Sequence, residues 1–447
     1  MAQTSSLPRS APDAGAPEFR SALTRIRTFD GGHNGLNAIS TIAAARASRS
    51  GSGGPLESIT FAVKDNIDVA DLPTTAGSLA LEGSLPRRSA DLVDALERAG
   101  AVLVAKTNQL ELSGWVTFAA PTGYSALGGR ALNPHDPRLT TGGSSSGAAV
   151  AVAAGYVNLA IGTDTGGSVL NPAGMNAIYG LRPTVGRVSR RGIVPVSPRQ
   201  DTPGPMSLSI QLMASALAAI SVDTAETAVA DLDERRIESL RVGVPLLRGI
   251  DDGDLVHWRA RLEDLRTAGA TLVPILEDLP WQGHGDLTVP AYDFRESVGP
   301  YLAGVTAPTG VQDFDSLLAH YLAEPTKRMP FGADNLLRSA AIDLDRDRAQ
   351  SELVWHRQHT QATDTLSRLR DELAIDLVLF PQGGAAYLSS KSGYPSLTIP
   401  GSVGSDRLMH FTTALAMQPN AEHMLLEFAF GLEKTIGQPV PARLTEE

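Results

Sequence analysis

The sequence predicts an α/β fold, a single large domain whose mixed central β-sheet is covered by helices. Residues 57–112 alternate strand, helix and strand, as in a parallel or mixed sheet packed against helices. Residues 148–155, AAVAVAAG, lack a polar face, which indicates a helix buried on all sides. No polar linker interrupts the centre of the 447-residue chain, so one domain over residues 20–447 is favoured over two or three.

The N-terminal segment differs from the rest in composition. Residues 1–19 are rich in Ala, Pro and Ser and predict a flexible arm, followed by a helix beginning near Ser21. No apolar core of a secretory signal is visible in this segment. Residues 47–55, rich in Gly and Ser, predict a flexible loop.

The elements of the first half follow from apolar runs bounded by turn residues. Gly100 is well placed to end a helix as its C-terminal cap. The expected elements are a strand at 57–63, a helix at 90–100, a buried strand at 101–106, a short helix at 107–112, the buried helix at 148–155 and a strand at 157–163.

The second half continues the alternation of strands and helices. Residues 334–370 predict one long helix, with His356 and His359 on its exposed face. The other expected elements are strands at 239–245, 271–275, 376–381, 394–401 and 410–419, and helices at 254–269 and 421–437.

Composition excludes several functional classes. The net charge of −11 is poorly suited to binding a phosphate backbone, so neither a nucleic-acid partner nor a membrane partner is expected. The sequence contains no cysteine, which removes disulfides, thiolate nucleophiles and iron–sulfur clusters and fits a reducing compartment. We therefore expect a cytoplasmic protein; no stretch approaches the 18 apolar residues of a membrane span.

Two Gly/Ser clusters are the segments of the sequence that most strongly indicate a catalytic site. Residues 142–147, GGSSSG, enter the buried helix, and residues 163–168, TDTGGS, follow a buried strand. Backbone N–H groups at such boundaries stabilise negative charge, so a serine hydroxyl there could attack a carbonyl carbon while N–H donors hold the oxyanion. Most isolated Gly/Ser loops are ordinary turns, so each cluster alone is a weak signal.

The sequence gives less support to a phosphate-binding loop, a serine hydrolase with a histidine base, or a metal site. No Gly-Lys-Ser/Thr follows either cluster, which disfavours a phosphate-binding loop. Neither Ser144 nor Ser168 lies in a Gly-x-Ser-x-Gly elbow, and the histidines are scattered. No HExxH motif or paired carboxylate cluster predicts a metal, and no cofactor is expected. A lysine can act as the base when burial lowers its pKa, and Lys64 ends a buried strand.

Taken together, these segments resemble the amidase signature family. Lys64 lies in FAVKDN, Ser144 in GGSSSG, and Ser168 in GTDTGGS 24 residues later. Residues 72–78, 90–112, 179–195, 393–401 and 425–434 are also similar to the family pattern, and the resemblance covers roughly residues 30–437. Three motifs in this order and spacing are far more specific than any one of them.

The resemblance implies a role for each site residue. Ser168 would be the nucleophile, Ser144 the bridging serine after a cis Gly143–Ser144 peptide bond, and Lys64 the base. The backbone N–H groups of Thr165, Gly166, Gly167 and Ser168 would form the oxyanion hole. Asp65 is expected to face away from Lys64, because neighbouring residues at a strand end point to opposite sides.

Residues 188–206, 294–303 and 328–340 are similar to the peptide amidase branch of the family. The chain also departs from the family pattern. The family's usual Ser-Ile-Arg at the nucleophile is replaced here by Ser168-Val169-Leu170-Asn171, so the arginine beside the catalytic turn and its charge are missing. Residues 207–211 and 400–402 also differ from the usual segments. These departures concern the substrate more than the chemistry.

The resemblance implies an amide hydrolase that forms an acyl-enzyme on Ser168. Hydrazides, aryl amides and esters are related substrates, and a homodimer is left open. One alternative is the A component of a glutamyl-tRNA amidotransferase-type complex, which requires a B component and contacts with tRNA. Another is a non-catalytic binding or acyl-transfer relative. Leu170 and Asn171 raise this alternative, and the intact Lys64, Ser144 and Ser168 oppose it.

Overall fold

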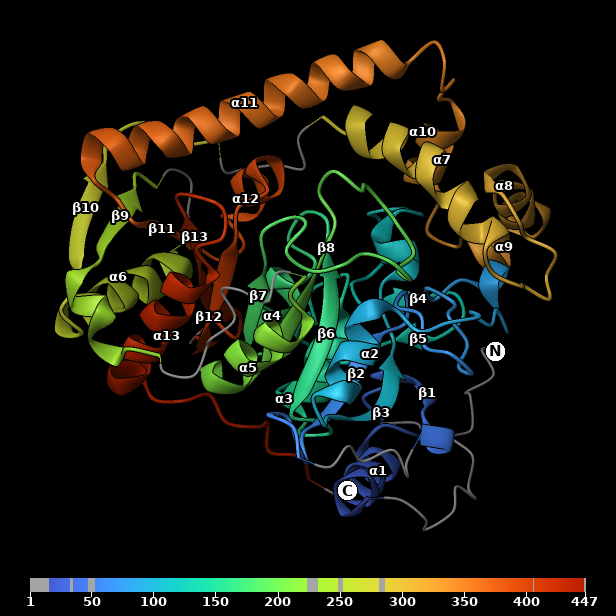
Figure 1. Ribbon diagram of the computed structural model, residues 1–447, viewed down its shortest axis with the longest axis horizontal. Helices are drawn as coiled ribbons and strands as arrows, with labels where there is room; N and C mark the ends of the chain where they lie inside the picture. The colour runs from blue at the N-terminus through green and yellow to red at the C-terminus, as the bar shows by residue number, and fades with distance from the viewer. Residues whose placement is uncertain are drawn as a thin grey trace.

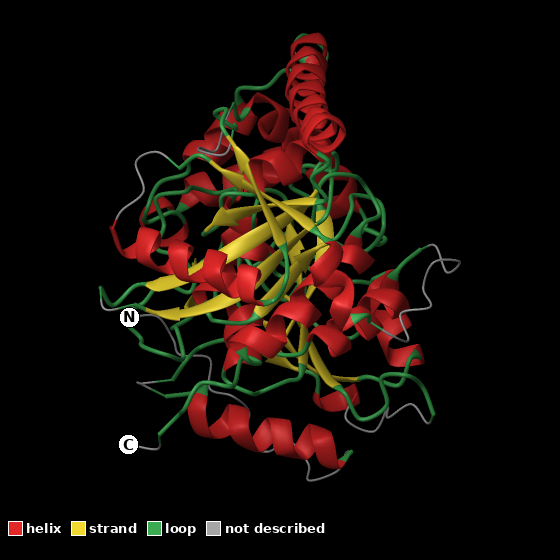
Figure 2. Cartoon of the chain, turned by 90° about the vertical axis from the view of Figure 1, so that its left-hand side faces the viewer, coloured by secondary structure: helices red, strands yellow, loops and turns green. Residues whose placement is uncertain are grey.

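The computed structural model describes residues 16–32, 35–46, 53–222, 232–247, 252–280, 286–404 and 406–445. Within them, an eleven-stranded mixed sheet forms the centre of a single α/β domain, with helices on both faces (Figures 1 and 2). In spatial order its strands are β1 (Ile39–Ile42), β3 (Val102–Thr107), β2 (Thr60–Lys64), β6 (Leu159–Asp164), β8 (Thr202–Ser207), β7 (Tyr179–Arg182), β12 (Ser396–Val403), β13 (Met409–Ala416), β11 (Leu377–Pro381), β9 (Arg241–Pro245) and β10 (Thr271–Ile275). The predicted fold class is confirmed.

Burial on both faces explains the continuous apolar runs of the inner strands. Strand β2 is buried along its whole length, with Phe61 and Val63 in one core cluster and Ala62 in another. Successive strand side chains point to opposite faces, so helices must cover both. Helices α2 (Asp91–Arg98), α5 (Ile210–Ile220), α6 (Asp252–Thr267) and α13 (Glu422–Ile436) contribute to the first cluster, and α1 (Pro17–Phe29), α3 (Ser146–Ala153) and α4 (Leu170–Met175) to the second.

Helix α3 confirms the prediction of a fully buried helix. All eight of its residues are buried, and they are Ser, Gly, Ala and Val. A Cβ on Gly147 would lie 2.4 Å from the backbone oxygens of Ala38 and Asn108, so only glycine fits there. The small side chains let the helix lie close to the sheet, which places its N-terminus beside the ends of β2 and β6.

A second, all-helical layer lies beyond one end of the sheet. It comprises α7 (Thr288–Ala303), α8 (Phe314–Ala323), α9 (Pro325–Arg328) and α10 (Asp334–Ala340), and α11 (Arg348–Leu373) runs above α12 (Ala386–Ser392) along the edge of the molecule (Figure 1). Among the described residues, no helix has the length and apolar character needed to cross a membrane.

The single long helix expected over residues 334–370 is wrong, since residues 341–347 separate α10 from α11. The Asp343 side chain accepts hydrogen bonds from the backbone N–H groups of Asp345 and Arg346, at 3.1 and 2.9 Å. These bonds replace helical ones, as aspartate often does near helix ends. His356 is exposed as expected, whereas His359 is partly buried, its Nδ1 lying 2.7 Å from the Lys391 backbone oxygen.

The helix expected at 107–112 is also absent. Thr107 ends β3, and a short 3-10 turn spans Glu111–Gly114, with Leu112 and Ser113 at positive φ. The Asn108 side chain bonds the Gln109 N–H at 2.8 Å and so holds the chain out of a helix. At the N-terminus, the first helix begins at Pro17 rather than near Ser21 and buries Phe19. Residues 1–15 of the expected arm and 47–52 of the expected loop lie outside the described residues.

Candidate active site

The sheet brings the three motifs together. Strands β2 and β6 are parallel neighbours, with Val63 level with Ile161, so Lys64 at the end of β2 lies beside Thr163 near the end of β6. The Gly/Ser loop before α3 approaches the same edge, and the backbone N–H of Ser145 donates to the Ser168 carbonyl at 3.2 Å. Side chains separated by about a hundred residues in sequence therefore share one site, at the strand ends where α/β sheets commonly bind ligands.

Lys64 and Ser144 are in direct contact. The Lys64 Nζ donates to the Ser144 Oγ at 2.7 Å and to the Thr163 Oγ1 at 2.9 Å. The Gly143–Ser144 peptide bond is cis, which confirms that expectation. Lys64 is completely buried, and this burial lowers its pKa to about 7, although the charges of Asp164 and Asp201 act in the opposite direction. A substantial fraction of the amine is therefore neutral at pH 7 and able to accept a proton.

Asp65 lies apart from this pair, as expected. Its carboxylate is 3.2 Å from the Lys106 Nζ and accepts a hydrogen bond from the Thr75 hydroxyl. Sequence reasoning did not find Thr163, whose hydroxyl accepts from both Lys64 and the Asn66 side chain. Thr163 occupies the first position of the second cluster, and only the pairing of β2 with β6 shows that its hydroxyl faces Lys64.

Ser168 lies in the turn between β6 and α4 and opens into a cavity of about 470 Å³. Within the described part of the chain its hydroxyl has no hydrogen-bond partner, so the expected bond between the Ser144 and Ser168 hydroxyls is not formed. One rotatable bond positions the serine oxygen, and catalytic hydrogen bonds often close only when substrate is bound. Trp115 and Phe118 line the same cavity.

The backbone of residues 165–168 is only in part arranged as expected for an oxyanion hole. The Gly167 N–H donates to the Asp164 Oδ1 at 2.7 Å, so this donor is already used within the turn. The N–H groups of Thr165, Gly166 and Ser168 have no acceptor in the described residues, and all three residues line the cavity. Gly167 has a φ of +99°, a conformation that glycine adopts without strain.

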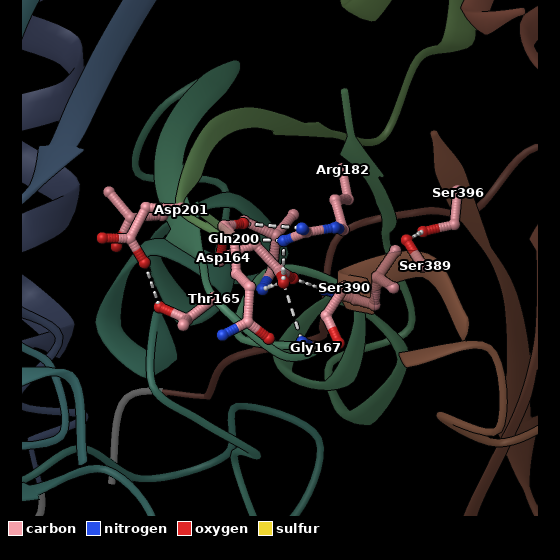
Figure 3. A network of polar contacts seen from close by, with 12 residues as sticks. Asp164, Thr165, Gly167, Arg182, Gln200, Asp201, Ser389, Ser390 and Ser396 are labelled. Atoms are coloured by element: carbon pink, nitrogen blue, oxygen red, sulfur yellow. Dashed lines mark hydrogen bonds and ion pairs between the residues drawn. The ribbon is translucent and has the colours of Figure 1, made fainter. Parts of the chain in front are cut away.

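Asp164 organises this turn (Figure 3). Its carboxylate accepts from the Gly167 and Val169 N–H groups, both at 2.7 Å, and pairs with the Arg182 guanidinium at 2.7 Å. The Arg182 Nη2 donates to the Gln200 backbone oxygen at 2.6 Å. Neither side chain of the Asp164–Arg182 pair is exposed. Arg182, on β7, thus supplies a buried positive charge beside the turn, where Leu170 and Asn171 have none.

Breaking this pair is expected to destabilise the protein. Arg182→Met leaves the Asp164 carboxylate buried without its counter-ion, which costs about 3–5 kcal/mol in free energy of unfolding. Arg368→Met is the matched control, because Arg368 and Glu277 pair at 2.7 Å on the surface and such pairs contribute about 1 kcal/mol or less. Urea unfolding of both variants measures the difference; equal midpoints would show that the buried pair contributes no more than the exposed one.

Comparison with known proteins identifies similar chains. A family model described as Amidase matches residues 20–299. The solved structure of native peptide amidase from Stenotrophomonas maltophilia superposes with a TM-score of 0.84 at 31% sequence identity, over 95% of this chain and 94% of that chain. Mandelamide hydrolase from Pseudomonas putida is 29% identical over 419 residues, 87% of this chain and 80% of the hydrolase.

Amidotransferase components are also similar over part of the chain. The A component of glutamyl-tRNA(Gln) amidotransferase from Anaeromyxobacter sp. (strain K) is 37% identical over 285 residues, 59% of this chain and 56% of that component. The matched part of the chain thus spans about half the length of such amidotransferase components.

Proposed function

The chain belongs to the amidase family, and on this basis we propose that it is an amide hydrolase with Ser168 as nucleophile, Ser144 as bridging serine and Lys64 as base. The contact between the Lys64 Nζ and the Ser144 Oγ, 2.7 Å apart, carries this proposal. A lysine whose pKa lies near 7 through burial, bonded to a serine beside a cavity that contains a second serine, has the parts needed for serine activation by lysine.

Acylation begins with a proton relay. Neutral Lys64 takes the hydroxyl proton of Ser144 as Ser144 takes that of Ser168, and the Ser168 Oγ bonds to the amide carbon. The carbonyl oxygen becomes an oxyanion, which accepts hydrogen bonds from the N–H groups of Thr165, Gly166 and Ser168. When the intermediate collapses, the C–N bond breaks and the proton held by Lys64 reaches the leaving nitrogen through Ser144.

Deacylation repeats the relay with water in place of the Ser168 hydroxyl. The water gives a proton through Ser144 to Lys64 and bonds to the acyl carbon. Collapse of the second intermediate returns that proton to the Ser168 oxygen and releases the carboxylic acid. One amide and one water thus become one acid and one amine, and all three side chains return to their starting states.

The alternative function, the A component of an amidotransferase-type complex, predicts that the isolated chain releases ammonia only after a partner protein is added. It is supported by the 37% identity to the amidotransferase component over 285 residues. It is opposed by the similarity to peptide amidase along nearly the whole chain.

The lack of cysteine favours a reducing compartment, and we place the enzyme in the cytoplasm, acting on a small-molecule amide.

The purified chain alone is expected to release ammonia from simple carboxamides. A panel of amides, hydrazides and esters incubated with the enzyme and analysed by mass spectrometry measures this activity and ranks the acyl groups. Release only after addition of a partner protein would support the amidotransferase alternative. The absence of hydrolysis with every substrate, with or without a partner, would contradict the proposal.

A further inference from the structure

Lys391 is a buried lysine of the catalytic cavity that the proposed mechanism does not use. The sequence contains five lysines, and three are buried: Lys64, Lys106 and Lys391. The Lys106 Nζ has three oxygen partners: the Pro73 backbone oxygen at 2.6 Å, the Thr74 hydroxyl at 2.7 Å and the Asp65 carboxylate at 3.2 Å.

Lys391 lacks comparable partners. Its Nζ donates to the Gln200 Oε1 at 2.7 Å, and the described residues provide no other acceptor. An ammonium carries three N–H donors, so two are left without an acceptor in a residue that is 3% exposed. A buried cation in this condition is costly unless a ligand supplies the missing acceptors.

The charged groups around Lys391 do not neutralise it. Burial is the main influence on the pKa of Lys391 and lowers it to about 8. The charges of Asp293 and Asp286 favour the ammonium form, and that of Arg182 opposes it. The ammonium therefore predominates at pH 7. No described carboxylate lies within ion-pair distance of it, and Asp293 instead bonds the Ser197 hydroxyl at 2.5 Å and Arg199 at 3.1 Å.

The position of Lys391 relates it to the reacting serine. It lies in the last turn of α12, whose first residue, Ala386, packs on the turn that carries the nucleophile: a Cβ on Gly167 would be 3.0 Å from the Ala386 side chain. An α-helix rises 1.5 Å per residue, so Lys391 lies about 7.5 Å along the helix from Ala386. That is roughly the length of two extended residues.

Lys391 also sets the charge of the cavity. Of the described residues that line it, Lys391 is the one with a charged side chain; the others are apolar or neutral and polar. We propose that Lys391 forms an anion-binding subsite for a carboxylate on the acyl part of the substrate. For a primary amide the leaving group is ammonia, so any group that reaches Lys391 must belong to the acyl part.

This inference rests on the proposed amide hydrolysis and assigns it a substrate class, namely carboxamides whose acyl chain ends in a carboxylate. Monoamides of linear dicarboxylic acids, compared with neutral amides of the same chain length, are direct probes. Wild-type enzyme is expected to show at least a tenfold higher kcat/KM for the acidic member of the best-fitting pair.

Substitutions of Lys391 test the subsite. Lys391→Met is expected to raise the KM for the acidic amide about tenfold or more while changing the neutral amide little, and Lys391→Arg is expected to restore the preference. Lys434→Met, which removes an exposed lysine, serves as the control. An equal loss for both amides would identify Lys391 as a structural tie to Gln200 and overturn the inference.

The failure of this inference is distinguishable from failure of the proposed function. Hydrolysis of neutral amides without any preference for acidic ones would leave the function standing and overturn the subsite. If no amide were hydrolysed, calorimetric binding of the free dicarboxylates to wild type and Lys391→Met would decide the matter. Binding that depends on Lys391 supports the subsite, and equal or absent binding contradicts it.

Discussion

Replacing Ser168 by alanine is expected to abolish amide hydrolysis and preserve the fold. Loss of a serine nucleophile in comparable relays lowers kcat by about 10⁴- to 10⁶-fold. The Ser168 hydroxyl has no partner in the described residues and faces the cavity, so its removal breaks no hydrogen bond of the folded state. Steady-state ammonia release together with thermal unfolding of the variant measures both parts of the prediction.

Covalent labelling gives an independent check on Ser168. A fluorophosphonate is expected to label this serine in the wild type and to leave the Ser168→Ala variant unlabelled. Ser215→Ala is a suitable control, because Ser215 lies on α5, where its hydroxyl bonds the Gln211 backbone oxygen at 3.1 Å. Near-normal activity of Ser168→Ala, or labelling of another serine, would assign the nucleophile elsewhere.

Replacing Lys64 by alanine is expected to lower the rate by several orders of magnitude and to remove its dependence on pH near neutrality. The pKa of Lys64 is about 7, so below pH 7 the amine is mainly protonated and cannot accept a proton. Wild-type activity should therefore rise with pH through about 7 and stay high on the alkaline side until unfolding. An unchanged pH profile in Lys64→Ala would exclude Lys64 as the base.

Stability measurements separate this loss of rate from loss of fold. The pKa of Lys64 falls from 10.5 to about 7 on folding, so the unfolded chain binds the proton more tightly. The wild-type residue thus reduces stability increasingly as the pH falls from about 10.5 to 7. The isosteric Lys64→Met removes this cost and is expected to be at least as stable as wild type at pH 7, while remaining inactive.

Ser144→Ala tests the bridge between Lys64 and Ser168. It is expected to cost less in rate than Lys64→Ala, because a water molecule in the space of the hydroxyl can carry the proton. A larger loss for Ser144→Ala than for Lys64→Ala would indicate a role for Ser144 beyond proton transfer. The rates of the two variants, measured on one amide at the same alkaline pH, decide between these outcomes.

Local sequence was sufficient to predict those structural features that depend only on residues close together in the chain. The buried helix α3 follows from the apolar run of residues 148–155, and the strands β9, β10 and β11 follow from short apolar runs bounded by turns. The family pattern also located Lys64, Ser144 and Ser168 by order and spacing. Predictions failed where side chains compete with the backbone, as Asn108 does after β3 and Asp343 before α11.

The sequence by itself thus determined the fold class, the buried helix α3, the strands β2 and β6 and the three residues proposed for catalysis. The tertiary structure alone decided which polar groups meet. The pairing of Arg182 with Asp164 depends on the position of β7 in the sheet, and Lys391 reaches Gln200 across 191 residues of sequence. Periodicity describes residues within one element, whereas burial, pKa and ion pairing depend on the order in which elements pack. The lowered pKa of Lys64 and the unsatisfied donors of Lys391 therefore appear only in the folded chain.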